Sequence, residues 1–190
     1  IQNSGIILGT AGRMSFTGGT YIHARNGGSL PLATWNSTST ARVNGMINTA
    51  VGNLNQTFGN FTWDSPSQVL NFSFAAAITT INGDFTVANT GSGSIILKNF
   101  GGGTTATTVA GDYIQTGGRL TLVGTSESHN LNVRGDFNMS GGTLTRGGTP
   151  GATSVATVNF SGTTVQAFTK SGGTISNVIN FTIMNNAKVD

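Results

Sequence analysis

The sequence predicts an all-β protein: a right-handed parallel β-helix of about seven coils, each with three short strands. Composition and repetition carry this prediction. Gly, Thr, Asn and Ser make up half of the 190 residues, and these residue types favour turns and strands over helices. Hydrophobic residues, 36% of the chain, are spread along its whole length, which argues against disorder.

A Gly-Asp-aromatic triplet marks an internal repeat. Copies lie at 83–85, 111–113 and 135–137, which are 28 and 24 residues apart. A Gly-Gly pair follows the last two copies at the same offset, at 117–118 and 141–142. Because glycine adopts positive φ without steric cost, Gly pairs at matching corners favour a solenoid. A β-sandwich, which also uses short strands and Gly-rich turns, is the alternative.

Each repeat holds three strand-sized pieces separated by turn signals. In the unit that begins at 111 they are 112–115, 119–123 and 130–134. Alternation predicts that one set of side chains faces the interior and the other faces outward. The inward set is Leu120, Leu122, Leu131 and Val133, and the outward set is Thr121, Asn132 and Arg134. Further strands are expected at 69–74, 77–81, 84–88, 94–98, 105–110, 164–168, 174–178 and 180–184, with Phe72 and Phe74 pointing inward.

Residues 1–190 are expected to form one β-solenoid segment of a longer protein. The regular coils are expected within 83–190. Residues 26–66 interrupt the rhythm and contain both tryptophans, so irregular or enlarged coils are expected there.

Charge and cysteine content exclude several classes of function. Nine Lys and Arg residues lie scattered along the chain and give a net charge of +3, which does not make the basic face that nucleic acid binding requires. The absence of cysteine excludes disulfides, thiolate metal sites and cysteine nucleophiles. The longest apolar run, around 74–78, is far shorter than the roughly 20 residues of a membrane span.

Several stretches resemble a cassette found in large secreted surface proteins of Bacteroidota. They are 19–28, 33–36, 54–63 and 179–183, together with the Gly-Asp-Phe units. Such proteins are typically exported by the type IX secretion route. The resemblance covers most of the chain and carries no catalytic motif, and it implies a secreted, adhesin-like protein at the cell surface.

Asp84, Asp112 and Asp136 occupy equivalent corners of the repeat and are expected to form a ladder. Aspartate in a turn usually accepts hydrogen bonds from backbone N–H groups, which makes this a structural turn ladder. The alternatives are a calcium site or the carboxylate pair of a polysaccharide hydrolase. Because these residues define the repeat instead of interrupting it, the structural interpretation is favoured and no metal site is expected.

Tyr21, Trp35 and Trp63, with Asp64 beside them, are candidates for an aromatic platform on which sugar rings stack. The alternative is that both tryptophans pack inside enlarged coils.

The remaining candidates carry little functional signal. His23 and His129 lack acidic neighbours at metal-ligand or triad spacing. Arg119, Arg134 and Arg146 are the basic residues that a lyase mechanism would draw on, although a role in solubility is expected for them.

The function expected from these patterns is that of an extracellular structural or adhesive segment, a rigid stalk or interaction surface. Neither enzymatic activity nor a cofactor is expected. Partners would be cell-surface glycans, other surface proteins or the secretion machinery during export, with no nucleic acid and no membrane span. The alternative is a carbohydrate-active β-helix, a polysaccharide lyase or hydrolase whose catalytic coils lie outside this segment.

Overall fold

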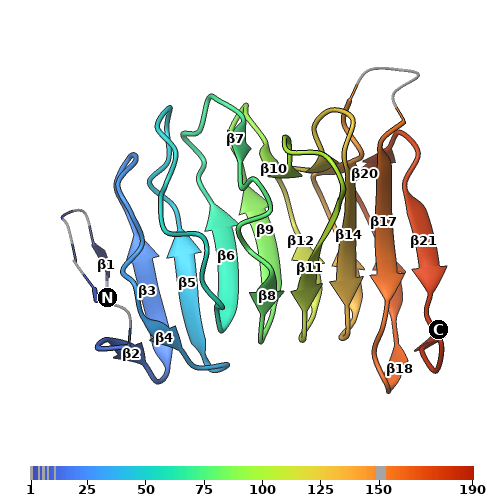
Figure 1. Ribbon diagram of the computed structural model, residues 1–190, viewed down its shortest axis with the longest axis horizontal. Coiled ribbons are helices and arrows are strands. Elements are labelled where there is room, and N and C mark those ends of the chain that lie inside the picture. Colours follow the sequence, from blue (N-terminus) through green and yellow to red (C-terminus); the bar gives the residue numbers. More distant parts are fainter. Residues whose placement is uncertain (1, 4, 6, 8, 11, 149–152) are drawn as a thin grey trace.

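The computed structural model describes the whole chain except residues 1, 4, 6, 8, 11 and 149–152. In this part of the chain the regular structure consists of β-strands stacked side by side in a single solenoid (Figure 1). No helix of a length and hydropathy that would cross a membrane occurs among the described residues.

The first sheet runs the length of the solenoid and contains eight described strands, all paired in parallel. In spatial order they are β1 (Gln2–Asn3), β3 (Gly19–His23), β5 (Ser39–Val43), β6 (Asn60–Asp64), β9 (Phe85–Asn89), β12 (Tyr113–Gln115), β15 (Phe137–Met139) and β19 (Phe168–Lys170). Each neighbour in this sheet comes from the next turn of the chain, which is the arrangement of a solenoid.

Two further parallel sheets, each with five described strands, complete the later coils. The second sheet contains β7 (Phe72–Ser73), β10 (Ile95–Lys98), β13 (Arg119–Val123), β16 (Thr143–Thr145) and β20 (Thr174–Ser176). The third contains β8 (Thr80–Ile81), β11 (Thr104–Val109), β14 (Ser128–Val133), β17 (Val155–Phe160) and β21 (Asn180–Ile183). Two short parallel pairs lie outside these sheets, namely β2 (Ser15–Phe16) with β4 (Thr34–Trp35) and β18 (Val165–Gln166) with β22 (Lys188–Val189).

This architecture confirms the predicted parallel β-helix of about seven coils. The β-sandwich alternative is wrong, because its strands would pair antiparallel, whereas every described strand pair is parallel. Most of the predicted strands are present, with their ends shifted by a few residues.

Of the two alternatives predicted for 26–66, irregular or enlarged coils, enlargement is wrong, whereas irregularity is present as a register shift between Trp63 and Asp64 and as isolated bridges at Ser29 and Phe58. Ile22 pairs with Arg42 and Arg42 with Thr62, so the coils here are 20 residues long. In the later coils, the residues that pair between neighbouring strands of the first sheet are 24, 28, 24 and 31 positions apart in the sequence. The early coils are short because strands of the second and third sheets begin only at β7 and β8. In the sequence of the 31-residue coil, β16 and β17 lie further apart than β13 and β14 do in the coil before, and the additional strand β18 lies between β17 and β19.

One column of aromatic rings runs along the inner side of the first sheet; its first four rings are buried, and its last ring, Phe168, is 38% exposed. Its centroids lie 6.1, 5.9, 5.0 and 5.0 Å apart from one coil to the next. The rings belong to Phe61, Phe85, Tyr113, Phe137 and Phe168. Rings at this spacing stabilise each other beyond the area that they bury, so the column ties each coil to its neighbours.

The interior positions agree with the predicted alternation. Leu120, Leu122, Leu131 and Val133 are fully buried, and Phe72 and Phe74 are almost so. Thr121 was expected to face water but is only 5% exposed. The connection after β16 covers it, since a Cβ atom added to Gly147 would lie 2.5 Å from Thr121 Cγ2.

Candidate functional site

The three repeat aspartates lie at equivalent corners, each immediately before a strand of the first sheet. The aromatic residues that follow them pair in register, Phe85 with Tyr113 and Tyr113 with Phe137. The preceding aspartates therefore stack in one column at the corner where the chain enters this sheet.

Each aspartate carboxylate accepts a hydrogen bond from the backbone of the following coil. Asp84 Oδ1 accepts the N–H of Asp112 at 2.8 Å, and Asp112 Oδ1 accepts the N–H of Asp136 at 2.7 Å. Asp136 Oδ1 accepts the N–H of Ala167 at 2.8 Å. The three side chains thus satisfy backbone donors at corners where the chain changes sheet, and a donor left unpaired there costs about 1–3 kcal/mol if it is buried.

Asn60 occupies the first position of the same column. Its Oδ1 accepts the N–H of Asp84 at 2.8 Å, and its Nδ2 donates to the carbonyls of Ser37 and Ser39 at 3.2 and 3.3 Å. Sequence reasoning missed Asn60 because the repeat was defined by aspartate. The triplet 59–61 reads Gly-Asn-Phe, so a search for Gly-Asx-aromatic would have found it. We call Asn60, Asp84, Asp112 and Asp136 the Asx ladder.

The glycine before each aspartate of the ladder leaves room for the acceptor side chain of the previous coil. A Cβ atom on Gly111 would lie 2.2 Å from Asp84 Oδ1, and one on Gly135 would lie 2.3 Å from Asp112 Oδ1. Such distances are too short for a methyl group. Glycine and the acceptor side chain therefore form one structural unit, which explains why they recur together.

The described residues contain no group of three or more His, Cys, Asp or Glu side chains that could hold a metal ion. Within the Asx ladder, each aspartate has one oxygen engaged by a backbone N–H group. This geometry is the one expected for aspartate in a structural turn.

The structure contradicts the aromatic platform. Tyr21, Trp35 and Trp63 are 1%, 3% and 0% exposed, so none presents a ring face to a sugar. Trp63 donates its indole N–H to Gln68 Oε1 at 2.7 Å. These rings fill the interior of the short coils, and Asp64 lies on the outer surface instead of beside them in a binding site.

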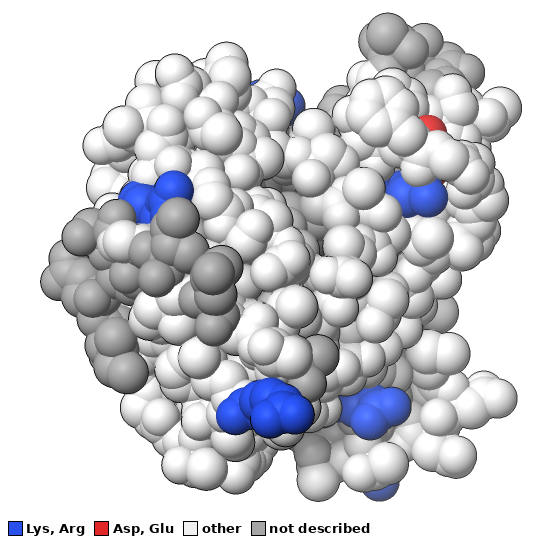
Figure 2. Space-filling model, turned by 60° about the vertical axis from the view of Figure 1, so that its left-hand side comes forward, with Lys and Arg blue, Asp and Glu red and all other residues white. Residues whose placement is uncertain are grey.

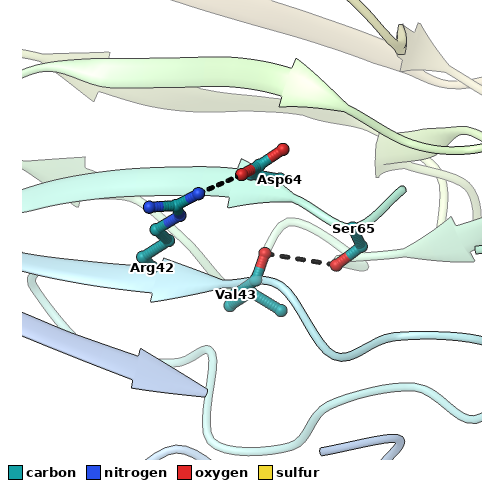
Figure 3. Close-up of polar contacts among 4 residues, drawn as sticks. All are labelled: Arg42, Val43, Asp64 and Ser65. Atoms are coloured by element: carbon teal, nitrogen blue, oxygen red, sulfur yellow. Dashed lines mark hydrogen bonds and ion pairs between the residues drawn. The ribbon is translucent and has the colours of Figure 1, made fainter. Parts of the chain in front are cut away.

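Asp64 pairs with Arg42 across neighbouring strands of the first sheet (Figure 3). Arg42 lies on β5 and Asp64 on β6, and their side chains are 40% and 21% exposed. Beside them, the Ser65 hydroxyl donates to the carbonyl of Val43 at 3.2 Å. Because the pair is in contact with water, it adds little stability and serves mainly to link two coils on their outer face.

Both histidines are buried and face the interior. His23 Nε2 lies 2.8 Å from the carbonyl oxygen of Gly27, and burial lowers the pKa of His23 below its usual value. His129 Nδ1 lies 2.9 Å from Thr105 Oγ1. Burial, assisted by the nearby charge of Lys98, lowers the pKa of His129 from 6.5 to about 4. Both imidazoles are therefore neutral near pH 7 and form part of the core.

The arginines of the later coils lie on different faces. Arg119 is exposed on β13 of the second sheet, whereas Arg134 is exposed just after β14 of the third. Arg146 Nη1 donates to the carbonyl of Ser154 at 3.2 Å. On the face shown in Figure 2, basic side chains form separate small patches instead of one continuous surface.

The fold and these contacts define the class of the protein: it is a parallel β-solenoid with a side-chain ladder at one corner. Comparison with known proteins finds no matching family model, no matching curated protein and no matching solved structure. A β-solenoid of this kind supports a structural or interaction role in general.

Proposed function

We propose that this chain is a non-enzymatic segment of a long extracellular β-solenoid at a bacterial cell surface, where it serves as a rigid stalk and interaction surface. Backbone pairing links the described coils along the whole solenoid, and from β6 onward the aromatic column and the Asx ladder add two further links between successive coils. The Asx ladder is the observation that carries the proposal, because its recurring aspartates are engaged in holding coils together.

The extracellular location rests on the sequence. The chain has no cysteine and only 8% charged residues, and it resembles secreted surface proteins of Bacteroidota. Surface glycans, other surface proteins and the export machinery remain the proposed partners. A protein with this role needs stiffness and a repetitive outer face, and both are properties of stacked coils.

Force measurement tests the mechanical role. The chain is held through handles at its two ends and stretched along the solenoid axis. We expect a sawtooth in which each step releases one coil; a 24-residue coil would release about 80 Å of chain. Smooth extension at low force, without steps of coil length, would contradict a rigid stalk.

Location and activity are tested separately. Antibodies against the chain should label intact producing cells, and brief protease treatment of those cells should remove the label. Label that appears only after permeabilisation would contradict the surface location.

The carbohydrate-active alternative is tested by incubating the chain with acidic and neutral polysaccharides and measuring new reducing ends and unsaturated products. Turnover that is lost in Asp112→Asn and Asp136→Asn would overturn the non-enzymatic proposal.

A further inference from the structure

The outer face of the third sheet carries amide and hydroxyl side chains in register. In one column Thr108 faces Asn132, and Asn132 faces Asn159. In the adjacent column Asn130 faces Thr157. Successive coils in a sheet are about 4.8 Å apart, so these polar groups form an array that repeats from coil to coil. The strands involved, β11, β14 and β17, stand side by side in Figure 1.

This array is hollowed beside Arg134. A depression of about 370 Å³ is lined in part by Asn130, Asn132 and Asn159, and a second depression of about 480 Å³ is lined in part by Thr163 and Thr164. Arg134 and Ser161 line both, so the two depressions adjoin. We call this surface the Arg134 groove and define it by Thr108, Asn130, Asn132, Arg134, Asn159 and Ser161.

The amides of the groove hold one another in place. Asn159 Nδ2 donates to Asn132 Oδ1 at 2.8 Å, and Asn132 Nδ2 donates to Thr108 Oγ1 at 3.4 Å. An amide side chain has two donor hydrogens and an oxygen that can accept two hydrogen bonds, so the partly exposed Asn132 retains capacity for a ligand, whereas Asn159, only 9% exposed, serves mainly to hold Asn132 in place. Because these side chains are already ordered on paired strands, binding would cost little conformational entropy.

The charge of the groove favours an anion. Arg134 is the one charged side chain among the described residues that line the two depressions. The nearest acid along the chain, Asp136, does not line them and accepts the N–H of Ala167 in the Asx ladder. An exposed guanidinium can bind a carboxylate through two parallel hydrogen bonds.

The form of the groove argues for one class of ligand. The surface combines side chains of β11, β14 and β17 with residues that follow these strands, and each strand is paired on both sides, so the groove offers no free strand edge to which a peptide strand could add. A single arginine does not provide the row of cations that a phosphate backbone requires, and no aromatic ring lines the groove for a base to stack on. A shallow array of amides and hydroxyls beside one cation suits a chain of hydroxyl groups that carries carboxylates.

We propose that the Arg134 groove binds an acidic polysaccharide, with a uronate carboxylate on Arg134 and sugar hydroxyls on Asn130 and Asn132. This inference rests on the proposed role as an interaction surface and names its ligand class.

This proposal is tested by calorimetric titration of the full chain with two polymers. One is polygalacturonate, and the other is fully methyl-esterified polygalacturonate, which lacks the carboxylate charges. Polygalacturonate should bind, and the affinity for the methyl ester should be lower by a factor of about ten or more. Arg134→Gln should weaken polygalacturonate binding by about the same factor. Arg119→Gln, which removes an exposed arginine from the second sheet, is the matched control and should leave binding unchanged.

Equal binding of the two polymers, or equal loss in Arg134→Gln and Arg119→Gln, would overturn the proposal. Equal affinity for polyglutamate or single-stranded DNA would also overturn it, because it would show general attraction of anions. Absence of binding by a chain that still gives the coil-length force steps would refute the glycan groove alone and leave the stalk intact.

Discussion

The carboxylate of Asp112 accepts the backbone N–H of Asp136 at 2.7 Å, one coil further along the chain. The same bond joins Asp84 to Asp112 in the preceding coil. A side chain of one coil thus satisfies the backbone of the next at the corner where sheet pairing is interrupted. Such contacts between successive coils add to the backbone pairing that holds the solenoid together.

Replacing Asp112 with alanine should lower the free energy of unfolding by about 1–3 kcal/mol, because the N–H of Asp136 loses its acceptor. Asp112→Asn should cost less, since asparagine retains Oδ1 and already serves in the Asx ladder as Asn60. Urea denaturation followed by circular dichroism measures both. An asparagine variant as unstable as the alanine variant would mean that the hydrogen bond is not the source of stability.

Gly135→Ala should destabilise the solenoid by about 1–3 kcal/mol through overpacking, because the new methyl group would meet Asp112 Oδ1 at 2.3 Å. Gly18→Ala is the matched control, since the nearest atom to its Cβ position is 3.8 Å away and its φ is not positive. Thermal unfolding of the two variants should separate them clearly. Equal losses would show that the corner relaxes around the added carbon.

Trp63→Ala should cost about 3–5 kcal/mol, because it opens a cavity in the core and leaves Gln68 without its indole partner. Val69→Ala, at a position 54% exposed, is the control and should change stability by less than about 0.5 kcal/mol.

Tryptophan fluorescence of the unaltered chain should be blue-shifted and resist quenching by iodide. Ready quenching would place Trp35 or Trp63 at the surface, contrary to the buried positions found here.

Stability should fall as the pH drops from 6.5 towards 4. In the unfolded chain His129 takes up a proton near pH 6.5, whereas in the folded chain its pKa is about 4. The unfolded state therefore binds more protons within this window, and folding loses about 3 kcal/mol across it. Above pH 6.5 both states are neutral at this residue, and the full stability is present.

Urea denaturation at about pH 7.5 and about pH 4.5 measures this loss, and His129→Leu should reduce it. A proton NMR titration assigns it, since the imidazole of His129 should titrate near pH 4. Titration of His129 at 6.5 or above would contradict the burial of its ring. His23, whose pKa is also lowered, contributes in the same direction and serves as the internal comparison.

The repeat made the fold predictable, because triplets in register place equivalent residues on successive coils. The pairing of Phe85, Tyr113 and Phe137 follows directly from their spacing in the sequence. Leu131 and Val133 were placed inside by alternation alone, and both are fully buried. Regular positions are predictable since each coil repeats the environment of the previous one.

The positions that escaped prediction depend on contacts outside the repeat. Trp35 and Trp63 lie in short coils that lack the Gly-Asp signal, so the sequence did not show which way their rings point. Thr121 alternates outward but is covered by a long connection from the next coil. Asn60 was missed because an amide replaces the carboxylate while retaining the acceptor oxygen.

The Asx ladder has a direction. Every acceptor belongs to the earlier coil and every donor to the later one, from Asn60 through to Ala167. A chain emerging from a pore N-terminus first would therefore offer each finished coil as a template with its acceptor in place, ready for the coil that arrives next. Because each coil that contributes a side chain to the Asx ladder brings its own acceptor, tandem duplication of such a coil leaves no group of the ladder unmatched, and the length of the solenoid can change by whole coils.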